Sequence, residues 1–215
     1  AGVPAARGGR GGRGAGGGRR LSWGRMALAG EAAGGVGGPA SLKGLGAARL
    51  DQLEAGERSV LERGAVEGEI CHRGAGQALG PGETKVTPRL ASLVRKELIR
   101  SDPGQLVGED GFRFRHLLLR DAAYEALPKA VRADLHQRFA SWLEEHGTEL
   151  VELDEILGYH LEQACRYRAE LGMPDGQILA SAARSHLNAA GPRATVRADD
   201  RAPGRPYERA AGLGP

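Results

Sequence analysis

The sequence predicts a mainly α-helical protein, in which a winged-helix-like domain is followed by α-helical hairpins that begin an α-solenoid. Apolar residues recur at helical spacing through most of residues 41–190. One stretch near residue 112 alternates apolar and basic residues, as short strands do. Both ends of the chain are rich in glycine, arginine or proline and lack a periodic apolar face, so we expect them to be disordered. We therefore expect a Gly/Arg-rich tail (1–40), a winged-helix-like domain (41–127), a helical-hairpin domain (128–190), and a linker or degraded first repeat (191–215).

The positive charge of the chain is concentrated in these two ends. The 215 residues carry a formal net charge of +3. Residues 1–40 contain six arginines and a single acid, whereas residues 41–190 contain 19 basic and 23 acidic residues. A basic protein often binds nucleic acid, but here the segment expected to fold is mildly acidic. Electrostatic binding of DNA by the folded part is therefore not expected.

The cysteines and the apolar runs indicate a cytoplasmic protein. Cys71 and Cys165 are far apart and neither belongs to a C-x-x-C pair, which is typical of a reducing compartment. No run approaches the ~18 apolar residues that a membrane span needs, and no secretory signal is recognised. The chain does not begin with Met, which suggests a fragment or a processed chain. Arg-Gly-Gly repeats at residues 7–14 resemble RNA-binding arms, but a featureless linker is the interpretation we favour, because no Phe or Tyr is interleaved.

The first predicted helices lie between Leu42 and Glu67. Gly56 falls between two apolar runs, so two short helices are expected, and the second ends at Gly68. A turn-rich stretch follows from Gly74 to Gly82.

The next helix is expected to start at Thr87-Pro88, with Thr87 as the N-cap and Pro88 as the first helical residue. Its apolar stripe is Leu90, Leu93, Val94 and Leu98. A strand-like exit, a loop around Gly108 to Gly111 and a strand at 112–116 come next. This order of elements is typical of a winged helix-turn-helix domain.

Four helices are predicted in the remaining sequence. The first, 117–127, ends at Pro128, and Gly147 closes the second. The third covers Leu153 to Leu171, and the fourth covers Gly176 to Ala190. Apolar spacing predicts that the second and third helices pack antiparallel along one seam. The second helix contributes Val131, Leu135, Phe139, Trp142 and Leu143 to this seam, and the third contributes Leu153, Ile156, Leu157 and Leu161. The apolar residues of the fourth helix are Ile178, Leu179, Ala182 and Leu187.

No motif for catalysis is recognised, and we do not expect this chain to be an enzyme. It contains no G-x-x-x-x-G-K-[ST] phosphate loop, no G-x-S-x-G elbow and no H-E-x-x-H helix. His160 and Cys165 are five residues apart, which on a helix places them about 140° apart rather than on one face. We therefore expect no metal, and interpret His136 and His160 as helix-surface or interhelical polar residues.

A set of motifs resembles one protein family. These are the runs 47–53, 57–68, 93–100, 112–124 and 156–163. Together they resemble the region downstream of the ATPase core in bacterial adenylate/guanylate cyclase-linked STAND-type AAA ATPases with tetratricopeptide-like repeats. The resemblance covers residues 42–190, and residues 207–213 resemble a worn piece of the first repeat helix. The family's nucleotide-binding loop and its Mg-binding acid would lie upstream.

The resemblance implies a role for three residues. In STAND ATPases the winged-helix domain packs against the nucleotide site and holds the closed, ADP-bound state. Plant disease-resistance ATPases use a Met-His-Asp motif at this point. By this resemblance His116 would contact the diphosphate, with Arg115 and Arg120 as charge partners, while Leu117 stands where the Asp is expected. The alternative is that His116 caps the following helix or packs in the domain core.

Two functions remain open at this point. The first is a non-catalytic regulatory relay that couples the ATP/ADP state of a signalling ATPase to a repeat sensor. It would carry no cofactor in this chain, although the parent family binds ATP or ADP with Mg. Its expected partners are the ATPase core and the repeat domain in cis, and a second copy of the chain, with no membrane and no nucleic acid. The alternative is a winged-helix nucleic-acid-binding module that uses Arg95, Lys96 and Arg100.

Overall fold

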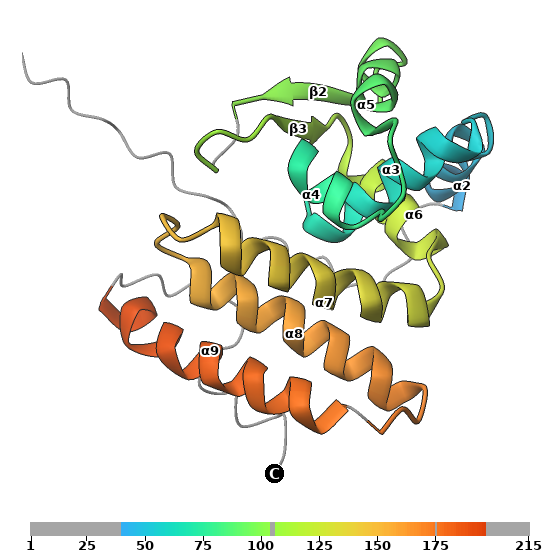
Figure 1. Ribbon diagram of the computed structural model, residues 1–215. Coiled ribbons are helices and arrows are strands. Elements are labelled where there is room, and N and C mark those ends of the chain that lie inside the picture. Colours follow the sequence, from blue (N-terminus) through green and yellow to red (C-terminus); the bar gives the residue numbers. More distant parts are fainter. Residues whose placement is uncertain (1–39, 104–105, 175, 197–215) are drawn as a thin grey trace, which may run out of the picture.

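The computed structural model describes residues 40–103, 106–174 and 176–196, and these residues are mainly helical with one small three-stranded sheet (Figure 1). The disorder expected for the N-terminal tail falls on residues 1–39, outside the described residues. Most of the segment 191–215, including the run at 207–213, lies outside them as well. Among the described residues, no helix combines the length and the apolar character needed to cross a bilayer.

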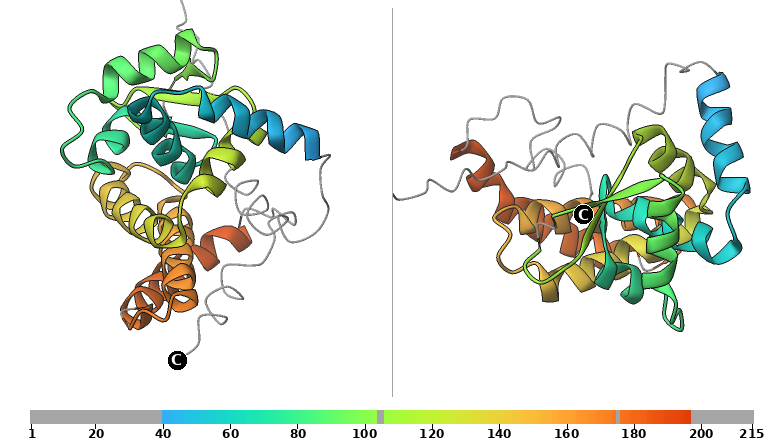
Figure 2. Two further views of the ribbon diagram at one scale, coloured as in Figure 1. Left: turned by 90° about the vertical axis from the view of Figure 1, so that its right-hand side faces the viewer. Right: turned by 90° about the horizontal axis from the view of Figure 1, so that it is seen from above.

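The first half contains five helices and the sheet. In chain order these elements are α2 (Ala40–Asp51), α3 (Ala55–Glu67), β1 (Ile70–His72), α4 (Arg73–Ala78), α5 (Val86–Arg95), β2 (Ile99–Asp102), β3 (Gly111–Phe114) and α6 (Leu117–Ala126). The sheet is antiparallel with strand order β1-β3-β2. The views of Figure 2 place α2 against α6, on the side of the molecule away from the last helix.

Several boundaries in this half differ from the sequence prediction. Gly56 lies inside α3, and the break falls at residues 52–54, where Glu54 forms a capping box with Glu57. The stretch expected to be turns contains α4, preceded by the unpredicted strand β1. A six-residue helix and a three-residue strand are too short to show a hydrophobic period, which explains why the pattern missed them.

The start of α5 also differs from the prediction. Its N-cap is Lys85, so Thr87 and Pro88 lie within the first turn. Proline is tolerated there because the first N–H groups of a helix have no intrahelical partner. The helix ends at Arg95, and Glu97, with φ 58°, turns the chain toward β2. Leu98 is therefore a core residue at the entrance to β2 and not part of the helical stripe.

The second half is a layer of three antiparallel helices, α7 (Lys129–His146), α8 (Leu153–Glu170) and α9 (Gly176–Val196) (Figure 1). The predicted stops at Gly147 and Gly172 are both confirmed, and Gly172 takes a positive φ of 68°. The helix predicted to end at Ala190 continues for six more residues, to Val196.

Two hydrophobic clusters form the core. The first belongs to the first half and gathers α3, α5, the sheet and α6 around residues such as Leu61, Leu93, Ile99 and Phe114. The second spans both halves, because Val66 of α3 and Leu79, the C-cap of α4, belong to the same cluster as Phe139 and Leu143 of α7. The halves therefore share a core.

The predicted seam between α7 and α8 is confirmed with one exception. Leu135, Phe139, Trp142 and Leu143 are buried with Ile156 and Leu157, and Leu153 and Leu161 pack against them. The prediction that Val131 belongs to the seam is wrong, because Val131 lies at the start of α7 and is exposed. The prediction that Ile178 belongs to the apolar face of the last helix is wrong as well, because Ile178 is 77% exposed. The buried face of α9 consists of Leu179, Ala180, Ala183, Leu187 and Ala190.

Candidate functional site

The corner at the start of α6 carries two of the three residues singled out by the resemblance. His116 is the N-cap of α6 in an extended conformation, follows β3 directly and is exposed. Its side chain makes no capping hydrogen bond, so neither of the two structural roles considered for it, capping or packing in the core, is observed. Arg115 is exposed beside it, and its nearest carboxylate oxygen, on Glu97, lies 3.9 Å away.

Arg120 is not part of this exposed corner. It is buried in α6, and its Nη2 lies 2.8 Å from Oδ1 of Asp121, while its Nε is buried without a hydrogen-bond partner. The residues that do accompany His116 at the surface are Leu117 and Leu118, which are 49% and 46% exposed. The corner formed by residues 115–118 thus combines two polar side chains with two exposed leucines.

A line of four hydrogen-bonded rings connects α6, α7 and α8, and we call it the Tyr–His chain. Oη of Tyr167 lies 2.9 Å from Oη of Tyr124, which lies 2.8 Å from Nε2 of His136. Nδ1 of His136 lies 2.8 Å from Nδ1 of His160. Both histidines are fully buried, and Nε2 of His160 has no partner. His136 and His160 are therefore interhelical polar residues, one of the two roles expected for them.

Burial fixes the charge state of these rings. It lowers the pKa of His160 to about 3. Burial, followed by the fields of His160, Arg166 and Arg132, lowers the pKa of His136 well below its ordinary value. Both imidazoles are consequently neutral at physiological pH, and each carries a single N–H.

The pKa values of the two tyrosines shift in opposite directions. Burial, together with the neighbouring Tyr167, raises the pKa of Tyr124. Burial also acts to raise the pKa of Tyr167, but the contacts of its hydroxyl with Tyr124, Arg132 and Arg166 outweigh burial and lower that pKa.

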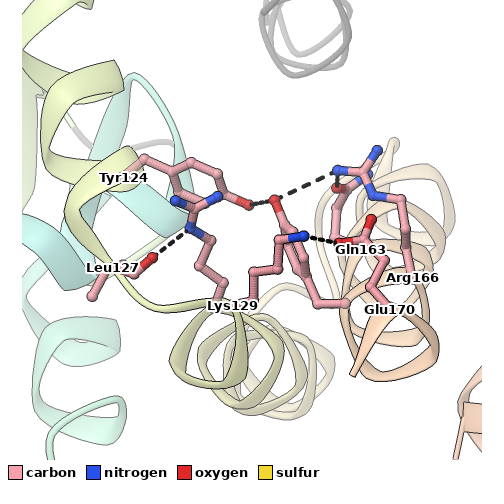
Figure 3. A network of polar contacts seen from close by, with 8 residues as sticks. Tyr124, Leu127, Lys129, Gln163, Arg166 and Glu170 are labelled. Atoms are coloured by element: carbon pink, nitrogen blue, oxygen red, sulfur yellow. Dashed lines mark hydrogen bonds and ion pairs between the residues drawn. The ribbon is translucent and has the colours of Figure 1, made fainter. Parts of the chain in front are cut away.

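Two arginines border the outer end of the Tyr–His chain (Figure 3). Arg132 donates from Nε to the Leu127 carbonyl, and its guanidinium lies 4.8 Å from the centre of the Tyr124 ring. Arg166 donates from Nη2 to Oε1 of Gln163 at 2.5 Å and to Oη of Tyr167 at 3.5 Å.

One acid whose charge acts on both arginines, Glu170, is already occupied. Glu170 is paired with Lys129 at 2.7 Å, as Figure 3 shows. The hydrogen bonds of both guanidiniums end on neutral oxygens, so their charge is not neutralised by a bound carboxylate.

A second buried polar pair lies where β1 meets α7. Oε2 of Glu67 accepts from the His72 backbone N–H at 2.9 Å and lies 3.1 Å from His72 Nδ1. The His72 ring stacks on Trp142 of α7, with ring centres 6.3 Å apart. Burial raises the pKa of Glu67. The stacking of His72 on Trp142 adds an aromatic contact between the halves, and the side chains of Glu67 and His72 are buried.

Of the three basic residues considered for nucleic-acid binding, Lys96 is paired with an acid. Nζ of Lys96 lies 2.5 Å from Oε2 of Glu57, whose pKa is lowered chiefly by that bond. Arg89 of α5 pairs with Glu83, and Arg113 of β3 bridges Asp102 and Glu69 at 2.8 Å each. Arg95 and Arg100 remain exposed. Acids therefore neutralise only part of the positive charge on this face.

The sequence contains a pattern that indicates the Tyr–His chain, and the sequence prediction did not use it. His160, Gln163 and Tyr167 follow one another at i, i+3 and i+7 on α8, and Arg132 and His136 at i and i+4 on α7. A polar stripe at helical spacing beside an apolar seam indicates a buried hydrogen-bonded network. In the described part of the chain, no three His, Cys, Asp or Glu side chains form a group able to hold a metal ion.

Comparisons of the chain with protein-family models, with curated proteins and with solved structures found no match.

Proposed function

We propose that this chain is a non-catalytic relay module of a signalling ATPase, of the kind found between the ATPase core and the repeats of cyclase-linked STAND proteins. In this role the exposed corner at residues 115–118 contacts the nucleotide-binding core, and the helical layer α7–α9 leads toward the repeat sensor. One observation carries the proposal: a single short helix, α6, bears the exposed His116 at its start and Tyr124 of the Tyr–His chain in its last turns.

The geometry of α6 suits a relay. His116 and Tyr124 are eight residues apart, which is about 12 Å along a helix. A helix of this length moves as a rigid body, so a displacement at His116 reaches the hydroxyl of Tyr124. That hydroxyl bonds His136 of α7 and Tyr167 of α8, and a network of buried hydrogen bonds of this type allows few alternative arrangements. Movement of α6 is therefore transmitted to both helices.

The arrangement of the first half supports a winged-helix domain. Three helices, α3, α4 and α5, alternate with an antiparallel sheet whose last two strands form a hairpin, as in winged helix-turn-helix domains. The helical layer supports the start of an α-solenoid, because consecutive antiparallel helices stack side by side in one direction. Both assignments agree with the family that the sequence motifs resemble.

The alternative, a winged helix that binds nucleic acid, is less well supported. Such proteins derive most of their affinity from Lys and Arg side chains that contact phosphates. Here Lys96 and Arg89 are already bound to carboxylates. The exposed Leu117 and Leu118 beside His116 suit contact with a protein surface better than contact with a phosphate backbone.

The experiment is to express this chain in cis with the coding region immediately upstream and to measure the ADP retained after gel filtration. The proposal expects that region to encode a phosphate-binding loop, and expects His116→Ala to release ADP that the wild type retains. His146→Ala, a histidine at the far end of α7, is the matched control and should retain ADP. An upstream region without such a loop, or equal ADP retention by both variants, would contradict the proposal.

A further inference from the structure

We propose that Arg132, Arg166 and Tyr167 form a binding site for a small oxyanion of the phosphate or carboxylate type, and that its occupancy sets the direction of the hydrogen bonds along the Tyr–His chain. The regulatory role of this site, at the joint between α6, α7 and α8, rests on the proposed function. Binding itself is a property of the described residues and is tested on this chain alone.

The two guanidiniums converge on one side chain, that of Tyr167. Arg166 donates from Nη2 to the Tyr167 hydroxyl at 3.5 Å, and the guanidiniums of Arg132 and Arg166 lie over the Tyr167 ring, 5.6 and 5.2 Å from its centre. Both arginines are only partly buried, so the site opens to the surface. Two arginines beside one hydroxyl are an arrangement suited to an oxyanion, because guanidinium groups bind carboxylate and phosphate oxygens through parallel N–H donors.

Among the described residues no carboxylate forms an ion pair with either guanidinium, although the charge of Glu170 acts on both. Glu170 is held by Lys129, and the remaining partners of the arginines are backbone carbonyls, an amide oxygen and the tyrosine hydroxyl. Nε of Arg166 is buried without any partner. A bound anion would compensate two cations and supply acceptors for N–H groups that lack them.

The Tyr–His chain has two ways of arranging its protons. In the inward direction Tyr167 donates to Tyr124, Tyr124 donates to Nε2 of His136, and His136 donates from Nδ1 to His160. In the outward direction each of these bonds is reversed, and the hydroxyl of Tyr167 can donate to an acceptor outside the Tyr–His chain. Every ring keeps one proton in both cases, so the two arrangements are isomers of equal charge.

The unpartnered Nε2 of His160 makes the two arrangements differ. In the inward direction this buried atom carries an N–H that has no acceptor, whereas in the outward direction it carries only an unpaired lone pair. The outward direction in turn requires an acceptor for the Tyr167 hydrogen, next to two positive charges. An oxyanion oxygen meets that requirement, so its binding selects the outward direction and moves the proton of His160 from Nε2 to Nδ1.

The test is a titration of this chain, with ¹⁵N-labelled histidine, by inorganic phosphate and separately by acetate at constant ionic strength. Long-range ¹H–¹⁵N spectra report which nitrogen of His136 and His160 carries the proton. We expect a saturable change to the Nδ1–H form of His160 with one of the two anions, and the anion that is effective identifies the ligand class. Arg166→Gln should weaken binding about tenfold or more, since a charged hydrogen-bond donor is lost.

Two further variants make the result specific. Tyr167→Phe removes the hydroxyl that connects the anion site to the Tyr–His chain. This variant should therefore bind the anion without a tautomer change at His160. Arg138→Gln, an exposed arginine on the same helix α7 as Arg132, is the matched control and should titrate like the wild type. No saturable response of the wild type to either anion, or a response that Arg166→Gln leaves unchanged, would overturn the inference. Because no ATPase core is needed, such a failure would leave the ADP-retention test of the proposed function unaffected.

Discussion

The Nδ1 atoms of His136 and His160 lie 2.8 Å apart in the fully buried space between α7 and α8. At this distance one ring must donate and the other must accept, so the contact exists only while at least one ring is neutral. The joint between the two halves therefore depends on uncharged imidazoles at its centre, enclosed by Phe139 and by the rings of Tyr124 and Tyr167.

The first prediction concerns acid sensitivity. The folded pKa values of His136 and His160 lie below the value near 6.5 that histidine has in an unfolded chain, so the unfolded state binds more protons on acidification. The free energy of unfolding should therefore fall as pH drops below about 6.5, by up to ~1.4 kcal/mol per pH unit for each histidine. Urea unfolding at pH 7 and pH 5 measures this loss.

The control for that prediction is His160→Gln, which keeps a polar group but removes one titrating site. Its unfolding free energy should depend less on pH than that of the wild type over the same interval. The buried Glu67 has a raised pKa and acts in the opposite sense as the pH falls through that pKa, since the folded state then binds more protons. A wild-type stability that is constant from pH 7 to pH 5 would contradict the neutral, buried state of the two imidazoles.

The second prediction concerns the shared core. Phe139 is 1% exposed and contacts Trp142 and His160, so truncation to alanine leaves a cavity. Phe139→Ala should lower the free energy of unfolding by about 3–5 kcal/mol. Glu144→Ala, on the exposed face of the same helix, should change it by less than about 0.5 kcal/mol. Equal and small shifts of both melting temperatures would mean that this face of α7 is not buried in solution.

The third prediction concerns the contact between α8 and α9. A methyl group added at Gly158 would lie 2.7 Å from the side chain of Leu187 and 3.3 Å from its backbone nitrogen. Gly158→Ala should therefore destabilise the helical layer by about 1–3 kcal/mol, although alanine favours a helix. Adding Leu187→Ala should recover part of the loss, because the side chain that is overpacked is removed. Gly176→Ala, at a position with open space around it, is the control and should cause little change.

The fourth prediction concerns nucleic acid. Since Lys96 and Arg89 are engaged by carboxylates, mobility shifts at about 150 mM salt should show no sub-micromolar binding of duplex DNA by this chain. Any residual binding should weaken steeply with salt and should change little in Arg95→Ala. Tight binding that Arg95→Ala abolishes would favour the nucleic-acid alternative over the relay.

The long helices of this protein could be predicted because their apolar residues repeat over several turns. For α7 and α8 the period identified both the seam and its partners, from Leu135 to Leu161. The prediction for Val131 failed at the first turn of α7, where this residue is exposed. The prediction for Ile178 failed because Ile178 lies off the buried face of α9, to which its neighbour Leu179 belongs. The short elements β1 and α4 hold too few residues for a period, and their formation depends on pairing with β3 and packing against α7.

The polar joint could not be predicted from local pattern alone. Tyr124 and Tyr167 are 43 residues apart, and only the return of α8 beside α6 brings their hydroxyls together. The exposure of His116 likewise depends on which faces of α6 are covered by α2 and α3. Arg120, which the motif placed with His116, is buried in α6, whereas His116 is the N-cap with an extended backbone and is exposed.

We propose that α6 couples the corner at His116 to the helices α7 and α8 through the hydroxyl of Tyr124. The test is hydrogen exchange of the α7 and α8 amides in this chain expressed in cis with its upstream region, compared between ADP and ATP. We expect a difference in the wild type that Tyr124→Phe abolishes and that Tyr159→Phe, which lies outside the Tyr–His chain, preserves. Exchange that is identical in the two nucleotide states, or a difference that persists in Tyr124→Phe, would contradict it.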